Sequence, residues 1–336
     1  MSFKSAVLTM AILCVVSAVP AVAQQSLGDM VAEGGYDWLI GKWVATTDDG
    51  GKLELEQKWG LDKHVMLVDF KMGGFQMHGM IVLVPSREEI IQVGADNRGG
   101  TWKGLWSDEY GDAVHRMEQT KADGEVQKAD LVHTRVDADT MKVAMYAVDS
   151  DGYRASEAWG TVTYKRQKGA SASGGSAAQG FDGGDQDKLG DLMAQYGYEW
   201  LIGKWLAKGE MDSENYVDFT WTLDKHAVLV DVKIGEFKYH GMINFVASRE
   251  EVIQVGADNM GGYWKGTWSE DYEGAANRHE MLRADGTTAK MEHVYVKVDG
   301  SSYKVKQYGV DDDGYRASSP RGELTFKRQK ADAPSK

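Results

Sequence analysis

Cysteine is almost absent from this sequence. The one cysteine among 336 residues, Cys14, lies in an apolar N-terminal run. The rest of the chain therefore has no disulfide, no thiolate metal site and no cysteine nucleophile. Proline is scarce as well, with 4 residues, beside 40 glycines, 11 Trp, 15 Tyr and 8 Phe. This balance is typical of many short strands joined by open turns.

Basic side chains are also few. The 38 Lys and Arg face 51 Asp and Glu, a formal charge of −13. An acidic surface repels phosphate backbones, so we expect no nucleic-acid partner. The length predicts about two domains, each large enough to form a core without metal or disulfide support.

The N-terminus carries the features of a secretion signal. Lys4 supplies a positive charge, 6–19 is almost entirely apolar, and Ala21-Val22-Ala23 has the small-x-small form of a cleavage site. The alternative is a membrane anchor, but the apolar run is shorter than the ~20 residues that span a bilayer. We expect a signal peptide over 1–23, cleavage after Ala23, a periplasmic or secreted protein, and no transmembrane segment in the mature chain.

The rest of the chain is a tandem repeat. The segment 36–43, YDWLIGKW, returns as YEWLIGKW at 198–205, an offset of 162. The same offset aligns 28–168 with 190–330 without a gap, and more than half of the 141 positions are identical. Each copy is domain-sized, so the sequence predicts two similar domains.

The domains are separated by 169–189, rich in Gly, Ser and Ala, and followed by a tail at 331–336. Such a linker cannot bury enough apolar area to order itself and should behave as a flexible coil. We expect two tethered domains, unless an interface that the sequence does not reveal holds them together.

Within each copy, apolar residues alternate with period two between turn sequences, which predicts about ten strands in meander order. A short helix is expected at 27–33. The strands expected in the first copy are 41–47, 52–59, 64–72, 75–84, 89–95, 101–107, 113–121, 126–136, 142–148 and 153–166. Closure hides the sheet edges, so two antiparallel up-and-down β-barrels are expected, with a two-sheet sandwich as the alternative.

Several segments resemble a known family. The sequence LIGKW at 39–43 is similar to the Gly-x-Trp opening of lipocalins and related calycin barrels, and FxxHGM at 75–80 and TWKGLW at 101–106 follow in a fitting order. The copies resemble uncharacterised secreted bacterial lipocalin-like domains and, more distantly, the haem-binding barrel nitrobindin. The resemblance implies a barrel with a cavity and no established chemistry.

One hairpin has a register that can be calculated. With Gly73-Gly74 as a two-residue turn, Asp69 pairs with His78, and in the second copy Asp231 pairs with His240. The carboxylate would fix the tautomer of the imidazole or stabilise its protonated form. The pairs are candidates for a polar anchor in the cavity; the alternative is an ordinary cross-strand pair.

Two tryptophans flank a glycine at Trp102-x-Gly104-x-Trp106, matched by Trp264-x-Gly266-x-Trp268, and all three positions of each motif share one face of a strand. The gap at the glycine would admit part of a flat ligand, or the glycine would relieve crowding in a packed core.

Four matched arginines complete the candidate ligand-binding residues: Arg116, Arg154, Arg278 and Arg316. If they point inward, they would bind a carboxylate, as the related fatty-acid-binding barrels imply; if they point outward, they are solvated strand charges.

Motifs of common enzymes and cofactors are missing, so no catalytic residue, metal site or cofactor is predicted. Haem is not expected either, because nitrobindin takes its axial histidine from the late strands and 152–168 contains none. His78 would be the substitute.

The sequence thus predicts a protein that binds a small, apolar or amphiphilic ligand in one or both barrels. One alternative is a structural or protein-interaction module whose barrels are filled by their own side chains. Another is an enzyme that uses the Asp69 and His78 pair as a general base.

Overall fold

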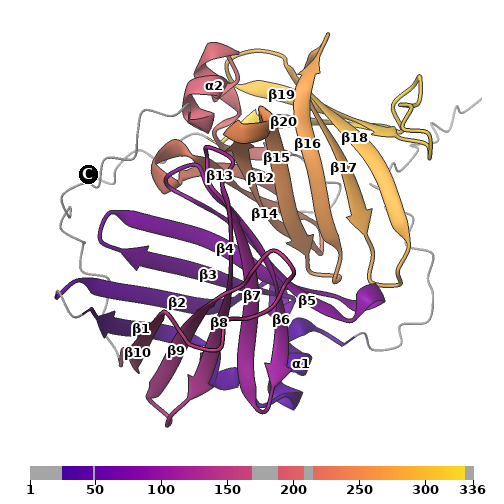
Figure 1. The fold of residues 1–336 in the computed structure, drawn as a ribbon. Helices are drawn as coiled ribbons and strands as arrows, with labels where there is room; N and C mark the ends of the chain where they lie inside the picture. Colours follow the sequence, from indigo (N-terminus) through magenta and orange to yellow (C-terminus); the bar gives the residue numbers. More distant parts are fainter. Residues whose placement is uncertain (1–24, 48–49, 169–187, 208–214, 330–336) are drawn as a thin grey trace, which may run out of the picture.

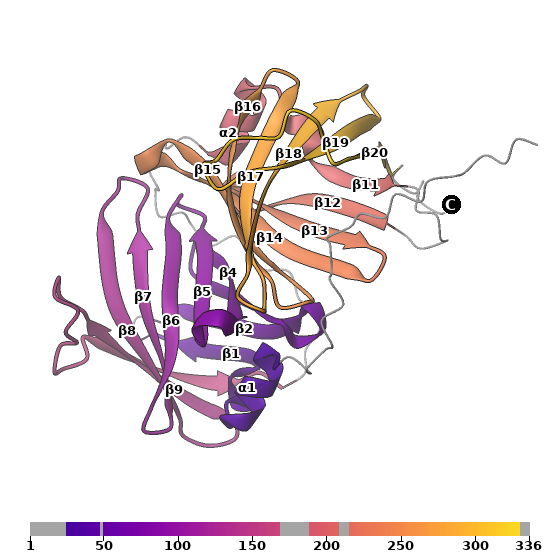
Figure 2. The same ribbon diagram turned by 90° about the vertical axis from the view of Figure 1, so that its right-hand side faces the viewer.

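A computed structural model describes residues 25–47, 50–168, 188–207 and 215–329 (Figure 1). Two closed antiparallel barrels, each with ten strands in meander order, form the molecule (Figures 1 and 2). Barrel 1 contains β1 (Gly41–Thr46), β2 (Lys52–Gly60), β3 (Val65–Met72), β4 (Phe75–Val84), β5 (Glu89–Asp96), β6 (Thr101–Glu109), β7 (Asp112–Thr120), β8 (Val126–Arg135), β9 (Thr140–Ala147) and β10 (Gly160–Arg166). Barrel 2 contains β11 (Gly203–Ala207), β12 (Asn215–Thr222), β13 (Ala227–Ile234), β14 (Phe237–Val246), β15 (Glu251–Asp258), β16 (Tyr263–Asp271), β17 (Gly274–Leu282), β18 (Thr288–Lys297), β19 (Ser302–Gly309) and β20 (Gly322–Arg328). The prediction of a tandem all-β barrel fold is confirmed.

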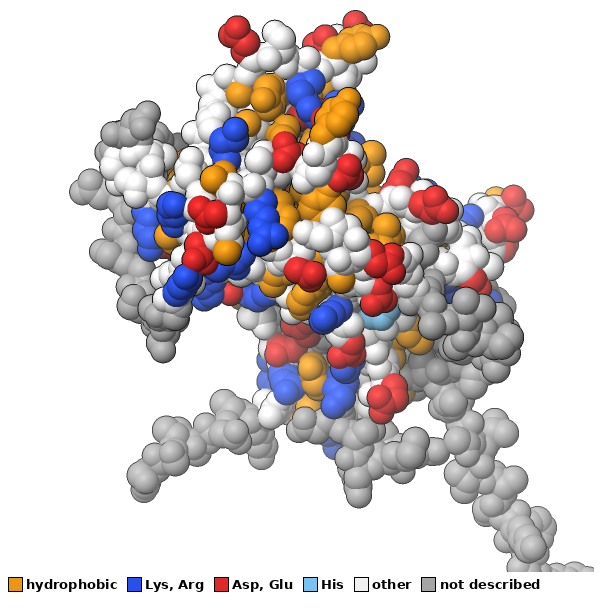
Figure 3. All heavy atoms as spheres, turned by 90° about the horizontal axis from the view of Figure 1, so that it is seen from below, with side chains coloured by type: hydrophobic (Ala, Val, Ile, Leu, Met, Phe, Trp, Pro, Cys, Tyr) orange, Lys and Arg blue, Asp and Glu red, His pale blue; other side chains and the backbone are white. Residues whose placement is uncertain are grey.

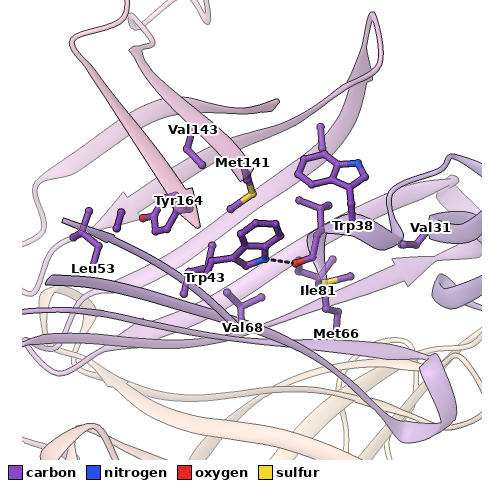
Figure 4. Close-up of a cluster of buried hydrophobic side chains, with 14 of the residues drawn as sticks. Val31, Trp38, Trp43, Leu53, Met66, Val68, Ile81, Met141, Val143 and Tyr164 are labelled. Atoms are coloured by element: carbon purple, nitrogen blue, oxygen red, sulfur yellow. Dashed lines mark hydrogen bonds between the residues drawn. The ribbon is translucent and has the colours of Figure 1, made fainter. Parts of the chain in front are cut away.

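A short helix closes one end of each barrel: α1 (Leu27–Glu33) in barrel 1 and α2 (Leu189–Gln195) in barrel 2. Ser26 caps α1 through a capping box with Asp29. The Trp43 indole N–H donates to the Leu39 carbonyl at 2.9 Å (Figure 4). The Arg166 guanidinium lies 4.2 Å from the centre of the Trp43 ring. This closed end holds the main apolar cluster of barrel 1.

The last strand of each copy begins later than expected. A strand is predicted over 153–166, but β10 starts at Gly160. The preceding residues form a loop joined to the sheet by an isolated bridge between Val148 and Arg154 and by backbone hydrogen bonds from Ala155 N–H to the Ala147 carbonyl and from Trp159 N–H to the Met145 carbonyl. Residues 153–159 therefore lie in a loop on the outside of the barrel. There the loop contacts a buried carboxylate, which is described below.

The two barrels dock through the outer faces of corresponding strands. One buried apolar cluster combines residues of β3, β4 and β5 with residues of β13, β14 and β15. Its fully buried members include Val65, Met80, Val82, Ala227 and Met242. The barrels are therefore packed together, which is the case that the sequence could not reveal.

The contact is reciprocal, because equivalent positions of the two copies face each other. Met80 and Met242, which differ by the repeat offset, both belong to the shared cluster. At the rim of the contact, Lys238 Nζ forms an ion pair with Asp62 at 2.8 Å. Asn97 Nδ2 donates to Asp224 at 3.3 Å. Such self-complementary use of one patch is characteristic of an isologous interface.

Three sequence predictions fall largely on residues that are not described. The signal peptide at 1–23 and the tail at 331–336 lie outside the described residues, as does 169–187 of the linker. Leu189, the last linker residue by the sequence prediction, is the first residue of α2 and is buried. The domain boundaries remain predictions. Among the described residues, no helix has the length and apolar character needed to cross a membrane.

Candidate functional site

The tryptophans of both repeat motifs point into the barrels. Trp102 Nε1 donates to Asp96 at 2.8 Å and Trp106 Nε1 donates to Gln92 at 3.0 Å. Trp264 and Trp268 repeat these bonds in barrel 2, with Asp258 at 2.7 Å and Gln254 at 2.9 Å. These bonds anchor each indole to the barrel wall. Contact of these rings with a ligand stays a prediction.

The glycine between the tryptophans makes room for a histidine. A Cβ at Gly104 would lie 2.4 Å from His115 Nε2 and 2.4 Å from the Arg116 carbonyl oxygen. At Gly266 it would lie 2.6 Å from the His279 Cβ. The space beside each glycine is thus occupied by the protein itself, which favours the packing interpretation of the glycine.

A pair of buried histidines lies inside barrel 1. The His115 ring stacks on Trp106 with centroids 4.9 Å apart, and the His133 ring lies 5.1 Å from the same indole. His115 Nε2 and both nitrogens of His133 are buried and have no hydrogen-bond partner among the described residues. Burial lowers the pKa of His115 to about 3, aided by nearby His133, and burial lowers the pKa of His133 to about 4. Both rings are neutral at pH 7.

Barrel 2 holds a comparable pair, displaced along the barrel axis. His279 and His293 lie on β17 and β18 with ring centroids 4.7 Å apart. His279 lies two residues after the position on β17 that is equivalent to His115. His293 lies two residues before the position on β18 that is equivalent to His133. On antiparallel strands both shifts point the same way. The positions equivalent to His115 and His133 hold Asn277 and Tyr295, so a comparison at the fixed offset does not match the histidines, and the opposite shifts are the sequence signal that reveals them.

The interiors of the two barrels are filled differently. Tyr239 in barrel 2 lies over two glycines, since a Cβ at Gly241 or Gly256 would come within 2.2 Å of its hydroxyl oxygen. The corresponding residue in barrel 1 is Met77, which points inward but is only partly buried, as is Met117. Tyr239 and His279, the barrel 2 counterparts, are buried. At these two positions barrel 1 has the more accessible side chains, whereas at two other inward positions the order is reversed: Gln254 and Tyr295 are partly exposed where Gln92 and His133 are buried.

The Asp and His pairs form with the predicted register, but on the outer wall. Asp69 pairs with His78 and Asp231 with His240. His78 alternates with the inward-facing Met77 and shares the outer face of β4 with Met80 of the docking cluster. The pairs are therefore not anchors in a cavity; they lie where the barrels meet. Period two shows that two residues share a face but not which face is inside.

The four arginines also lie outside the barrels. Arg116 donates to both carboxylate oxygens of Asp130 at 2.8 Å, and Arg154 Nε donates to the same carboxylate at 2.6 Å. In barrel 2, Arg278 and Arg316 converge on Glu292 at 2.7 Å. These bonds fasten the loop before the last strand to the outer wall. The side chains therefore do not supply a counter-charge inside the barrel.

A groove of about 570 Å³ lies between the barrels. Val93, Ile253, Val255 and Tyr263 give it apolar surface. Its cationic side chains each have a carboxylate within 4.0 Å, so they leave no free positive charge: Lys103, Arg249, Lys265, Arg278 and Lys290. On the face drawn in Figure 3, basic and acidic side chains are likewise intermixed.

Groups of three or more potential metal ligands are absent from the part of the chain that the structure describes. The general-base alternative has the required pair, but the His78 side chain is only 7% exposed and faces the other barrel. A substrate would have no approach to its free nitrogen.

No protein-family model matches this sequence, and no curated protein matches it. Among solved structures, a search finds transferrin binding protein B from Haemophilus parasuis, with a TM-score of 0.17 and 8% identity over 84% of this chain and 86% of that chain. A likeness this weak carries no argument. The barrel fold rests on the strand pairing described above, and the resemblance to lipocalins and nitrobindin stays a prediction.

Proposed function

We propose that the protein is exported and binds a small, largely apolar ligand inside barrel 1. The observation that supports this is the difference between the interiors. Barrel 1 has partly exposed Met77 and Met117, where barrel 2 has buried Tyr239 and His279. The histidine pair of barrel 1 has three unpaired ring nitrogens among the described residues, and the pair of barrel 2 has one, His279 Nε2. Buried polar atoms are normally hydrogen-bonded, so the unpaired nitrogens call for a partner.

The chemistry of the interior limits the ligand. Trp106 and the methionines offer apolar and aromatic surface, while His115, His133 and the unpaired Gln57 Oε1 offer hydrogen bonds. Both imidazoles are neutral at pH 7, and the arginines lie outside. The ligand should therefore have an uncharged hydrogen-bonding group rather than an anionic end.

The test fills barrel 1 in the way that barrel 2 is already filled. Met77→Tyr places a tyrosine above Gly79 and Gly94, the counterparts of the glycines beneath Tyr239, and should abolish binding without loss of the fold. Tryptophan fluorescence of the full chain is titrated with a fatty alcohol, retinol and haem. We expect saturable quenching by at least one of them, with one site per chain and at least tenfold weaker binding in Met77→Tyr.

The matched control is Tyr239→Met, which should keep the barrel 1 site. Binding that survives Met77→Tyr but is lost in Val255→Arg would place the ligand in the groove between the barrels instead. A flat response to all three probes would remove the proposal. Export is tested separately: mass spectrometry of protein recovered from the periplasm or medium should give Gln24 as its first residue.

A further inference from the structure

The two Asp and His pairs meet across the contact between the barrels. His78 Nδ1 lies 2.7 Å from Asp69 Oδ1, and His240 Nδ1 lies 2.7 Å from Asp231 Oδ1. The two imidazole centroids are 6.0 Å apart. Nε2 of each ring is buried and has no hydrogen-bond partner within the described ranges.

The carboxylates determine what these nitrogens can bind. A carboxylate only accepts hydrogen bonds, so in the neutral ring Nδ1 carries the hydrogen and Nε2 has a free lone pair. Two such acceptors cannot bond to each other. Their shared partner must bring positive charge or hydrogen-bond donors.

The charges around the two rings favour a cation. Asp69 has a second partner, Lys58, at 3.2 Å, but Thr220 occupies the equivalent position beside Asp231. Among the described residues, Asp231 has no Lys or Arg within ion-pair distance. The Asp231 carboxylate, whose side chain is 49% exposed, therefore contacts solvent and the His240 ring, and none of the described basic side chains lies beside it to oppose a bound cation.

The spacing fits a single metal ion. With a metal-nitrogen bond of ~2.0 to 2.1 Å and ~1.1 Å from nitrogen to ring centre, two histidines on one ion have centroids about 5 to 6.4 Å apart, from tetrahedral to linear angles. The observed 6.0 Å lies toward the wide end of this range and corresponds to a nitrogen–metal–nitrogen angle of about 145°, so a tetrahedral ion would draw the two rings about 1 Å closer together. A carboxylate bonded to the remote nitrogen of a histidine is also the usual outer partner at metal sites.

We propose that His78 and His240 together bind one divalent transition-metal ion of the zinc class through their Nε2 atoms. Asp69 and Asp231 are positioning residues that fix the tautomer and the ring orientation. The remaining coordination positions are taken by water enclosed at the contact. The ion would then tie the two barrels together, one ligand from each.

The experiment uses the full, tag-free mature chain after treatment with a chelator. Isothermal titration with ZnCl₂ should give one ion per chain. His78→Gln and His240→Gln should each weaken binding at least tenfold, and the double variant should be no worse than either single variant, because one ion needs both rings. His64→Gln, which removes an imidazole outside the pair, should bind like the parent.

A second measurement separates the positioning role from a merely structural one. Asp69→Asn with Asp231→Asn should weaken binding several-fold and shift the visible absorption spectrum of bound Co²⁺, while far-UV circular dichroism stays unchanged. The proposal is overturned by no saturable zinc uptake, which would mean that only water or a proton joins the rings. It is also overturned by two independent ions per chain, or by parent affinity in both histidine variants.

Discussion

At the scale of single residues, the histidines buried inside the barrels matter most. His115, His133 and His293 have a pKa of about 3, about 4 and about 4, and the pKa of His279 is also lowered, in each case chiefly because burial disfavours the charged ring. Neutral rings suit a largely apolar interior at pH 7. They also make the fold sensitive to acid.

The sign of this sensitivity follows from proton linkage. An unfolded histidine titrates near ~6.5, above the folded values, so between about pH 6.5 and 4 the unfolded chain binds more protons. The free energy of unfolding should therefore fall as the pH drops through this window, by on the order of 2 kcal/mol per buried histidine at pH 5. Urea midpoints measured at pH 7 and pH 5 test this.

The matched variant uses the residues that barrel 2 carries at the same positions. His115→Asn with His133→Tyr should reduce the stability difference between pH 7 and pH 5. An unchanged difference would show that these two rings are protonated in the folded chain.

At the scale of elements, the strand order and hairpin registers could be predicted because turn sequences and period two determine them. The inward or outward direction of Asp69 and His78 could not. Every residue from His78 to Val84 of β4 is buried, since one face lies in barrel 1 and the other against barrel 2. Two covered faces remove the alternation that would distinguish inside from outside. The continuous run GMIVLV at 79–84 was the available sign of the docking face.

The candidate site was predictable only in part, for a related reason. The inward-facing tryptophans lie in a motif that both copies share, so the repeat revealed them. The histidine pairs lie at different heights along the barrel axis in the two copies. A position-by-position comparison of the copies therefore does not match them. The arginines Arg116 and Arg154 find their carboxylate, Asp130, only once the loop before β10 has folded back, a contact without local sequence signal.

That loop gives a prediction at the same scale. Arg154 joins Asp130 and Glu109, and it holds Tyr153 and Trp159 in an exposed loop over the barrel wall. Arg154→Ala should release the loop and raise the rate of chymotrypsin cleavage after these aromatic residues several-fold. Arg135→Ala, an exposed arginine at the end of β8, is the control and should leave the rate unchanged. Equal cleavage of both variants would show that the ion pairs do not hold the loop.

At the scale of the whole molecule, the docking face makes each barrel incomplete alone. A fragment of residues 24–168 would expose Val65, Met80, Val82 and Val84, all fully buried in the intact chain. We expect it to self-associate through this face, because contiguous apolar patches of this kind drive association. Analytical ultracentrifugation at micromolar concentration should show a dimer, and Met80→Asp should convert it to a monomer. A monomeric parent fragment would contradict the expectation.

The reciprocal docking also bears on how such a chain arises. Equivalent faces that meet about a two-fold axis are what a homodimer of a single-barrel ancestor would leave behind after gene fusion. Fusion replaces a concentration-dependent encounter with a fixed local concentration, so the pairing no longer depends on expression level. Fusion also allows the sequences of the two barrels to change independently. The interiors of the two barrels can then diverge, as Met77 in one and Tyr239 at the equivalent position in the other illustrate, which two identical subunits cannot do.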